Sequence, residues 1–246
     1  MQLIILGSGV YRPRTLRYPS GLVLKMGGNP VVFDAGCGTF MRLIQAGIDY
    51  AQVEHIFITH LHIDHVSDIL QYLWAYHLDR REDLYIYGPC GILEFIEKIR
   101  GLAKQFCTLP FNLIVKEVKG GEKVFLPFCE VKVADTLHSN ELFSVAYRVE
   151  REGKVFGYSG DTDYLEELVD FFYLADLLVL ECTTLSGQKV RGHLTPVECA
   201  TIAEKAKVGK VILTHLDLNL REVEEEFSRF YSGKFFVARD LLHIEV

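Results

Sequence analysis

Short apolar runs, separated by glycine, proline and asparagine, recur along the whole chain. Runs of about four to eight apolar residues with such boundaries are typical of buried strands. The expected strands are Leu3–Leu6, Leu22–Met26, Val31–Asp34, Ile56–Thr59, Leu84–Tyr87, Val124–Phe125, Val131–Ala134, Phe143–Val149, Val155–Tyr158, Leu177–Leu180 and Val211–Leu213. Gly27-Gly28-Asn29-Pro30 separates the second run from the third, so these two strands are expected to form a hairpin.

Segments with the helical spacing of apolar residues alternate with these runs. The expected helices are Phe40–Ala46, Asp68–Leu78, Ile92–Phe106 and Pro196–Lys207. Thr195 precedes the last helix and Glu198 follows three residues later, which is the pattern of a capping box. Because strand, loop and helix alternate without a Pro/Gly/Ser-rich linker, we expect one domain over residues 1–246. Its class is α/β, or α+β in some schemes, with sheets covered by helices.

Two segments that lie far apart in the chain resemble each other. Phe57-Ile58-Thr59-His60-Leu61 is echoed by Ile212-Leu213-Thr214-His215-Leu216. In both segments an apolar strand delivers a histidine from its end. The echo indicates pseudo-twofold halves of roughly residues 1–120 and 121–246.

Composition narrows the class of protein. No apolar run reaches the ~18–20 residues that a membrane span needs, so no membrane partner is expected. The six cysteines form no Cys-x-x-Cys pair, which disfavours a zinc knuckle or a redox dithiol. Reduced cysteines and the lack of a signal-peptide pattern point to the cytoplasm. The formal net charge of −7 argues mildly against a broad surface that grips nucleic acid.

The densest chemical signal is His60-Leu61-His62-Ile63-Asp64-His65, directly after an expected strand. Four side chains of metal-ligand type fall within six residues, and a short loop can aim all four at one place. Four such groups cannot surround one tetrahedral ion that must keep an open position. We therefore expect two ions, with His60 and His62 on one and with Asp64 and His65 on the other. A histidine-rich surface loop is the alternative, but it would not explain the partners downstream.

With this motif the chain resembles the metallo-β-lactamase superfamily, whose signature is His-x-His-x-Asp-His. The resemblance covers essentially the whole chain and implies a four-layer αββα sandwich with pseudo-twofold halves. It makes His138 the third ligand of the first ion, Asp161 the bridging carboxylate and His215 the last ligand of the second ion. The implied ligands are His60, His62, Asp64, His65, His138, Asp161 and His215. Zinc is the default ion, and manganese or iron would also fit this mixed set.

Within the superfamily, the ribonuclease Z branch fits best. Glyoxalase II-like enzymes and lactonases usually carry Pro-Gly-His-Thr around the third ligand, where this chain has Leu137-His138-Ser139. The β-lactamases mostly place a cysteine where this chain has Asp161. The segments similar to ribonuclease Z are Leu6-Gly7-Ser8-Gly9, Phe33-Asp34-Ala35-Gly36-Cys37-Gly38-Thr39, Ser159-Gly160-Asp161-Thr162 and His193-Leu194-Thr195.

This branch implies roles for residues beyond the ligands. His193 acts on the transition state or the leaving group, with Glu181 orienting it, and Asp64 also takes a proton. An unpaired Glu181 would be costly within its apolar run, and a partner such as His193 would relieve that cost. Arg17 and Thr195 are candidate substrate contacts.

Two basic stretches could hold a substrate phosphate or could simply be solvated. They are Arg12, Arg14 and Arg17, which lie between Tyr11 and Tyr18, and Lys189 and Arg191 before His193. The aromatic neighbours Tyr11 and Tyr18 could stack on a base.

The departures from ribonuclease Z concern the grip on tRNA. Of its Pro-x-Lys-x-Arg-Asn segment only Pro13 and Arg17 survive. Its tRNA-gripping arm lies between the third ligand and the bridging aspartate, and here positions 138 to 161 are only 23 residues apart. We therefore expect hydrolysis of a small phosphodiester and disfavour RNA, although the partner in a homodimer could supply a basic surface. The alternatives are a ribonuclease Z-type tRNA 3′ endonuclease, a hydrolase of a sulfate ester, lactone or thioester, and a non-catalytic binding module.

Overall fold

The structure is a computed structural model that describes residues 1–246 except 13–15, 80–81 and 218–219. Arg14 and Pro13 therefore lie outside the described residues. The chain divides into two compact units, unit 1 with Met1–Val118 and Asp240–Glu245, and unit 2 with Lys119–Arg239 and Val246. They follow the predicted halves except at the C-terminus, because β14 (His243–Glu245) pairs with β1 (Gln2–Gly7). The single domain over residues 1–246 stays a prediction.

Unit 1 is built on a mixed seven-stranded sheet in the order β14-β1-β2-β3-β4-β5-β6. Its further strands are β2 (Gly21–Met26), β3 (Asn29–Phe33), β4 (His55–Phe57), β5 (Leu84–Gly88) and β6 (Leu113–Glu117). Its helices are α1 (Thr39–Gln45), α2 (Ile63–Val66), α3 (Ile69–Asp79), α4 (Ile92–Arg100) and α5 (Lys104–Cys107), with a 3₁₀ turn at Tyr50–Gln52. Strands β3 to β6 run parallel to one another.

The predicted hairpin is confirmed as β2 and β3. The register pairs Met26 with Asn29, which leaves Gly27 and Gly28 as a two-residue loop. Both glycines have positive φ angles, 60° and 97°. This backbone matches the twist of the flanking strands, and glycine adopts it without a steric penalty.

The predicted helix over Ile92–Phe106 is wrong at its centre. Helix α4 ends at Arg100, and α5 begins only at Lys104. Ala103 between them has an extended backbone, with φ −149° and ψ 140°. The Arg100 guanidinium donates to the carbonyls of Phe106 and Cys107, which closes the chain back on itself after Gly101. Glycine is a poor helix former, and together with this local contact it overrides the apolar spacing on which the prediction rested.

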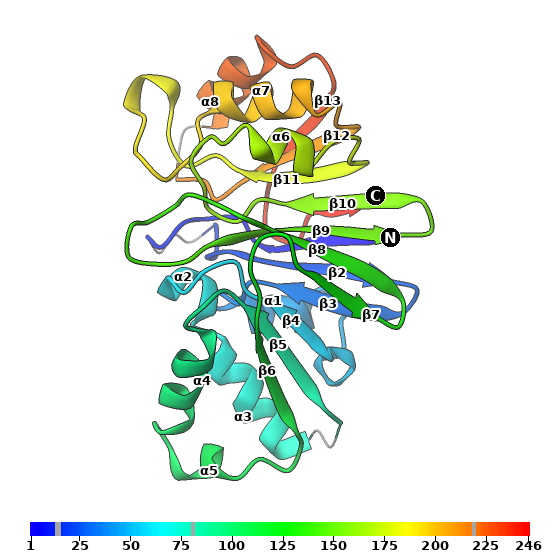
Figure 1. The fold of residues 1–246 in the computed structure, drawn as a ribbon, viewed down its shortest axis with the longest axis vertical. Helices are drawn as coiled ribbons and strands as arrows, with labels where there is room; N and C mark the ends of the chain where they lie inside the picture. The colour runs from blue at the N-terminus through cyan, green and yellow to red at the C-terminus, as the bar shows by residue number, and fades with distance from the viewer. Residues whose placement is uncertain (13–15, 80–81, 218–219) are drawn as a thin grey trace. The chain divides into compact units, whose positions relative to one another are not determined.

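Unit 2 repeats the arrangement with a second mixed sheet in the order β13-β12-β11-β10-β9-β8-β7. The strands are β7 (Lys123–Leu126), β8 (Cys129–Asp135), β9 (Val145–Arg151), β10 (Lys154–Tyr158), β11 (Leu177–Glu181), β12 (Lys210–Thr214) and β13 (Lys234–Val237). The helices are α6 (Glu167–Phe171), α7 (Pro196–Lys205) and α8 (Leu220–Ser228), with a 3₁₀ turn at Ser186–Gln188. Strands β10 to β13 are parallel, and α6, α7 and α8 lie beside this part of the sheet (Figure 1).

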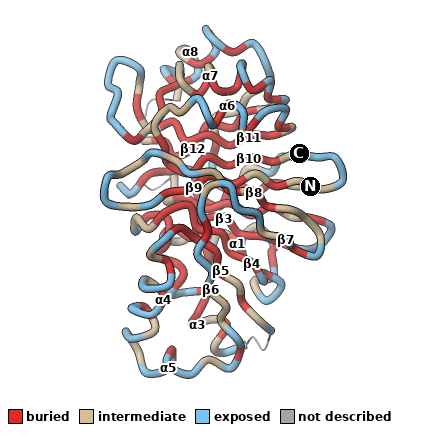
Figure 2. Tube along the Cα trace, in the orientation of Figure 1, coloured by how far each residue is buried: buried red, intermediate tan, exposed pale blue. Residues whose placement is uncertain are grey.

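The core of each unit fills the space between its sheet and its helices, and the central strands are buried along their length (Figure 2). In both units the carboxyl ends of the parallel strands meet at one edge of the sheet. In an open sheet with parallel strands, functional side chains gather at this edge. No helix among the described residues is long and apolar enough to cross a membrane.

Candidate metal centre

In unit 1 the ends of two neighbouring parallel strands place the histidine motif. Asp34 follows β3, and Thr59 and His60 follow β4, which pairs with β3 through Phe33 and Phe57. The Asp34 N–H donates to the Phe57 carbonyl over 2.8 Å, which holds the two strand ends side by side. The chain then turns into α2, a short helix that carries Asp64 and His65.

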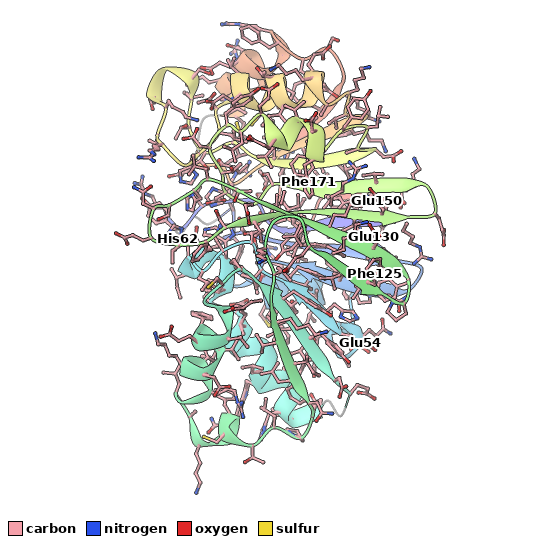
Figure 3. All side chains as sticks on the ribbon, in the orientation of Figure 1. Glu54, His62, Phe125, Glu130, Glu150 and Phe171 are labelled. Carbon is pink, nitrogen blue, oxygen red and sulfur yellow. The ribbon has the colours of Figure 1, made fainter. Side chains whose placement is uncertain are left out.

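The imidazoles of this motif face one another. Nε2 of His60 lies 3.0 Å from Nδ1 of His62, and Nε2 of His65 lies 3.9 Å from Oδ2 of Asp64. The rings of His60 and His65 are tilted, with centroids 4.1 Å apart. His60, Asp64 and His65 are buried, and His62 is partly exposed. His62 lies at the start of α2 (Figure 3). Two ring nitrogens held 3.0 Å apart suit a shared ion, because each can offer it a lone pair.

Asp34 anchors this group, a role to which sequence reasoning gave no weight. Its Oδ2 lies 2.7 Å from Nδ1 of His65, and its Oδ1 accepts the Thr59 N–H over 2.8 Å. The Asp34 backbone has a left-handed φ of 57°. Such a conformation costs about 1–3 kcal/mol in a residue other than glycine and is often found at functional sites. The only sequence signal was the Phe33-Asp34-Ala35 segment.

In unit 2 one carboxylate oxygen faces three histidines. Oδ2 of Asp161 lies 3.4 Å from Nε2 of His215 and 3.9 Å from Nε2 of His138. The ligand atoms of His138, Asp161 and His193 also lie within 4.8 Å of one another. Asp161 follows β10 and His215 follows β12, so the strand ends bring them to the same edge of the sheet. Nδ1 of His193, at 3.9 Å, is the third neighbour of this oxygen, and a bridging role of Asp161 stays a prediction.

The outward ring nitrogens of these histidines are held by the protein. Nδ1 of His138 lies 2.8 Å from the Gly192 carbonyl, and Nδ1 of His215 lies 2.7 Å from Oγ1 of Thr183. In unit 1, Nδ1 of His65 and of His60 meet Asp34 and Thr59 in the same way. Metal-binding histidines almost always donate their other N–H to such a partner, which fixes the tautomer and the orientation of the ring. The donor set therefore fits divalent metal ions.

Glu181 meets His193, as the sequence predicts. Oε1 of Glu181 lies 2.9 Å from Nδ1 of His193 and accepts the Thr162 N–H over 3.1 Å. Its other oxygen, Oε2, accepts both the N–H and the hydroxyl of Thr183. The side chain of Glu181 is buried, and these bonds compensate for its loss of hydration.

The loop that carries His193 is tied down by charge. The Lys189 ammonium donates to the His193 carbonyl, to Glu198 and to Asp163, at 2.6 to 2.7 Å. An ammonium has three N–H donors, so these contacts occupy all of them and favour a structural role over a phosphate contact. Burial alone would raise the pKa of Asp163, but the Gly192 N–H and Lys189 outweigh burial and hold that pKa below its usual value. Burial would lower the pKa of Lys189, but Asp163 and Glu198 raise it.

The two predicted substrate contacts have structural partners. Thr195 caps α7, and both halves of the predicted capping box with Glu198 are present. Arg17 is half-buried, and its Nη1 donates to the Ser8 hydroxyl over 2.7 Å. The ring of Tyr18 lies 4.4 Å beneath the guanidinium of Arg42. Contacts of these residues with a substrate stay predictions.

The comparisons with known proteins agree with this arrangement. The protein-family model of the β-lactamase superfamily domain matches residues 19–216. The chain belongs to the metallo-β-lactamase superfamily. Ribonuclease Z of Methanothermobacter thermautotrophicus is 31% identical over 301 aligned positions, which cover 100% of this chain and 97% of the relative.

Two solved structures share the metallo-β-lactamase fold. The metallo-β-lactamase fold protein YhfI from Bacillus subtilis has a TM-score of 0.88 at 22% identity, and the match covers 100% of this chain and 98% of YhfI. The short form of human tRNase Z has a TM-score of 0.84 at 25% identity, covering 100% of this chain and 99% of that chain. The predicted fold and the ribonuclease Z-like branch are thereby confirmed, and the protein is a metal-dependent hydrolase of this fold.

The sequence indicated the residues of ligand type in this metallo-β-lactamase fold, but not the residues that hold their side chains in place. Each unit contains buried histidine and aspartate side chains, which is consistent with a two-metal site. The residues that hold these clusters are Asp34, Thr59, Asp163, Thr183, Lys189 and Gly192. They lie at strand ends and in loops, where the periodicity of the sequence does not indicate hydrogen-bond partners. The signal that could have found Thr183 is the partial match of Leu180-Glu181-Cys182-Thr183 to the family motif.

Proposed function

We propose that this protein hydrolyses phosphodiester bonds in RNA as a ribonuclease Z-type endonuclease that acts at the 3′ end of tRNA. The likeness to ribonuclease Z over the whole chain carries this proposal. The pairing of Glu181 with His193 supports it, because that pair was the sequence feature specific to this branch. The comparisons thus favour the alternative from the sequence analysis over a small phosphodiester.

The proposed metal ligands are His60, His62, Asp64, His65, His138, Asp161 and His215. Their assignment rests on the order of the motifs along the chain and on the held outer nitrogens of four of the five histidines. Two divalent ions, zinc by default with manganese or iron as alternatives, would supply a water of lowered pKa and neutralise phosphate charge.

The chain's own residues would handle the protons and the orientation. Glu181 contacts Nδ1 of His193. This contact would hold the ring so that Nε2 acts on the substrate. His193 would then donate a proton to the leaving oxygen or stabilise its charge. Asp64 would accept a proton from the attacking water. Arg17 and Thr195 are proposed contacts for the substrate, a role that Arg17 would share with its hydrogen bond to Ser8.

A compact phosphodiester is the second candidate, and two observations favour it. Strands β9 and β10 with their turn occupy Val145–Tyr158, most of the interval in which ribonuclease Z carries its arm. The alignment with the Methanothermobacter relative also spans 55 positions more than this chain has residues. Together with the net charge of −7, these features would weaken a grip that depends on phosphate contacts.

The deciding experiment compares kcat/KM for pre-tRNA with kcat/KM for cyclic nucleotides, dinucleotides and an aryl phosphodiester at near-physiological salt. The metal content of the protein is measured before the assay. A His65→Ala variant prepared in parallel controls for contaminating nucleases. Cleavage of pre-tRNA at its 3′ end well above every small diester supports the ribonuclease proposal. The reverse order supports the second candidate, and turnover confined to an aryl sulfate, a lactone or a thioester would overturn both. The sequence leaves a homodimer open, and a measurement of the oligomeric state in solution tests it.

A further inference from the structure

Each unit contains a buried carboxylate that contacts one imidazole directly and a second imidazole through a threonine hydroxyl. In unit 1 the carboxylate is Asp34, which contacts Nδ1 of His65 over 2.7 Å. The Thr59 hydroxyl lies 2.9 Å from Oδ2 of Asp34 and 3.1 Å from Nδ1 of His60. All four residues are buried.

In unit 2 the carboxylate is Glu181, which contacts Nδ1 of His193 over 2.9 Å. The Thr183 hydroxyl lies 2.7 Å from Oε2 of Glu181 and 2.7 Å from Nδ1 of His215. In each unit the carboxylate stands at the end of one strand and the indirectly held histidine follows the next parallel strand, β3 with β4 and β11 with β12. The same chain of contacts therefore occurs twice.

The hydrogen bonds in such a chain can be donated in only one direction, from the imidazole to the hydroxyl and from the hydroxyl to the carboxylate. An ionised carboxylate only accepts hydrogen bonds, so the single hydroxyl proton of the threonine is donated to it. The hydroxyl oxygen must then accept the N–H of the imidazole at Nδ1. This fixes the neutral imidazole as the Nδ1–H tautomer and leaves the lone pair at Nε2, the nitrogen available to a metal ion.

We propose that Thr59 and Thr183 are positioning residues that set the tautomer of His60 and His215 for metal binding. The proposal rests on the ligand assignment of the proposed function. In unit 2 the shared carboxylate also links the ligand His215 to His193, so one buried charge orients both. In unit 1 the directly held imidazole, His65, is itself a proposed ligand.

The chain supplies a matched control in Thr214. In the sequence echo Thr214 takes the place of Thr59, immediately before the histidine. It is buried, yet within the described part of the chain its hydroxyl has no hydrogen-bond partner. Replacing an unpaired hydroxyl by a methyl group of similar shape should be nearly neutral.

The test compares Thr59→Val, Thr183→Val and Thr214→Val in the full-length protein, with Thr59→Ser and Thr183→Ser as conservative variants. Metal affinity is measured by competition with a chromophoric chelator, and ¹⁵N NMR of histidine-labelled, metal-free protein reads each tautomer. We expect Thr59→Val and Thr183→Val to weaken the affinity for one ion about 10- to 100-fold. The serine variants should restore it, and Thr214→Val should match the wild type.

Two outcomes would overturn the proposal. One is a wild-type, metal-free spectrum with the proton on Nε2 of His60 or His215, a measurement that needs no variant and so survives any folding defect. The other is Thr59→Val and Thr183→Val binding metal as tightly as Thr214→Val. Both readouts are independent of turnover, so a protein that binds metal as expected but cleaves no diester would reject the proposed function and leave this inference standing.

Discussion

Oε1 of Glu181 and Nδ1 of His193 lie 2.9 Å apart, and the Thr162 N–H donates to the same oxygen. Glu181 is the last residue of β11, whereas His193 lies on the loop before α7. An unpaired buried carboxylate is costly, so the contact with His193 stabilises Glu181 in its position. The ring of His193 is thereby held through Nδ1.

Replacing His193 tests its role as an acid. His193→Ala should lower kcat by roughly 10²–10⁴, the usual contribution of general acid–base catalysis, while the metal content barely changes. The loss should be smaller for an aryl phosphodiester, because a good leaving group needs less protonation. The ligand atoms of His193 lie within 4.8 Å of those of His138 and Asp161, so loss of metal from the variant would show that His193 is a ligand.

Metal content tests the proposed ligand set. Protein purified without chelator should contain close to two divalent ions per chain, and chelation should lower its thermal midpoint, since ions that bind only the native state stabilise it. Asp161→Ala should lose most of one ion, because Oδ2 of Asp161 faces both His138 and His215. Full turnover in a sample that elemental analysis shows to be free of metal would contradict the assignment.

Gly192 should be intolerant of any side chain. Its φ is +87°, and an added Cβ would lie 2.0 Å from the carbonyl oxygen of His138. Gly192→Ala should cost at least about 1–3 kcal/mol in the free energy of unfolding, from backbone strain and this clash. Gly187→Ala is the control in the same loop, because its Cβ would meet nothing within 4 Å. Urea unfolding of both variants measures the difference, and equal stability would mean that the loop relaxes freely.

Glu150 should make stability depend on acid pH. It stands opposite Glu130 on the neighbouring strand (Figure 3), and its Oε1 accepts from Lys132 and Arg148, each over 2.7 Å. Burial alone would raise the pKa of Glu150, but the bonds from Lys132 and Arg148 outweigh burial and lower that pKa. Its stabilisation is therefore complete above the unfolded pKa of about 4.3 and is lost as pH falls through the lower folded pKa.

The measurement is the unfolding free energy of the wild type and of Glu150→Gln between about pH 6 and pH 2.5. The difference between the two proteins should be largest at pH 6 and should shrink below the unfolded pKa of about 4.3. Glu152→Gln is the control, because its side chain is 76% exposed. A difference that grows as the pH falls would mean that the pKa of Glu150 is raised.

The sequence by itself determined the superfamily and the pairing of Glu181 with His193, and it predicted the metal ligands. These follow from local signals: a dense motif in His60–His65, strand ends that terminate at Asp161 and His215, and a carboxylate in an apolar run. The pseudo-twofold halves were also visible, because the echo around His60 and His215 needs only local similarity.

What only the tertiary structure decided is which residues hold those groups. The echo placed a threonine before each histidine, and by sequence alone Thr59 and Thr214 look equivalent. In the structure the Thr59 hydroxyl contacts Nδ1 of His60 in unit 1, whereas in unit 2 the Thr183 hydroxyl contacts Nδ1 of His215. The Thr214 hydroxyl has no hydrogen-bond partner within the described residues. A hydrogen bond depends on where neighbouring strands end and on the angle at which a side chain leaves the backbone. Those quantities are set by strand register and by the left-handed backbone of Asp34 and His215, and sequence periodicity specifies neither of them.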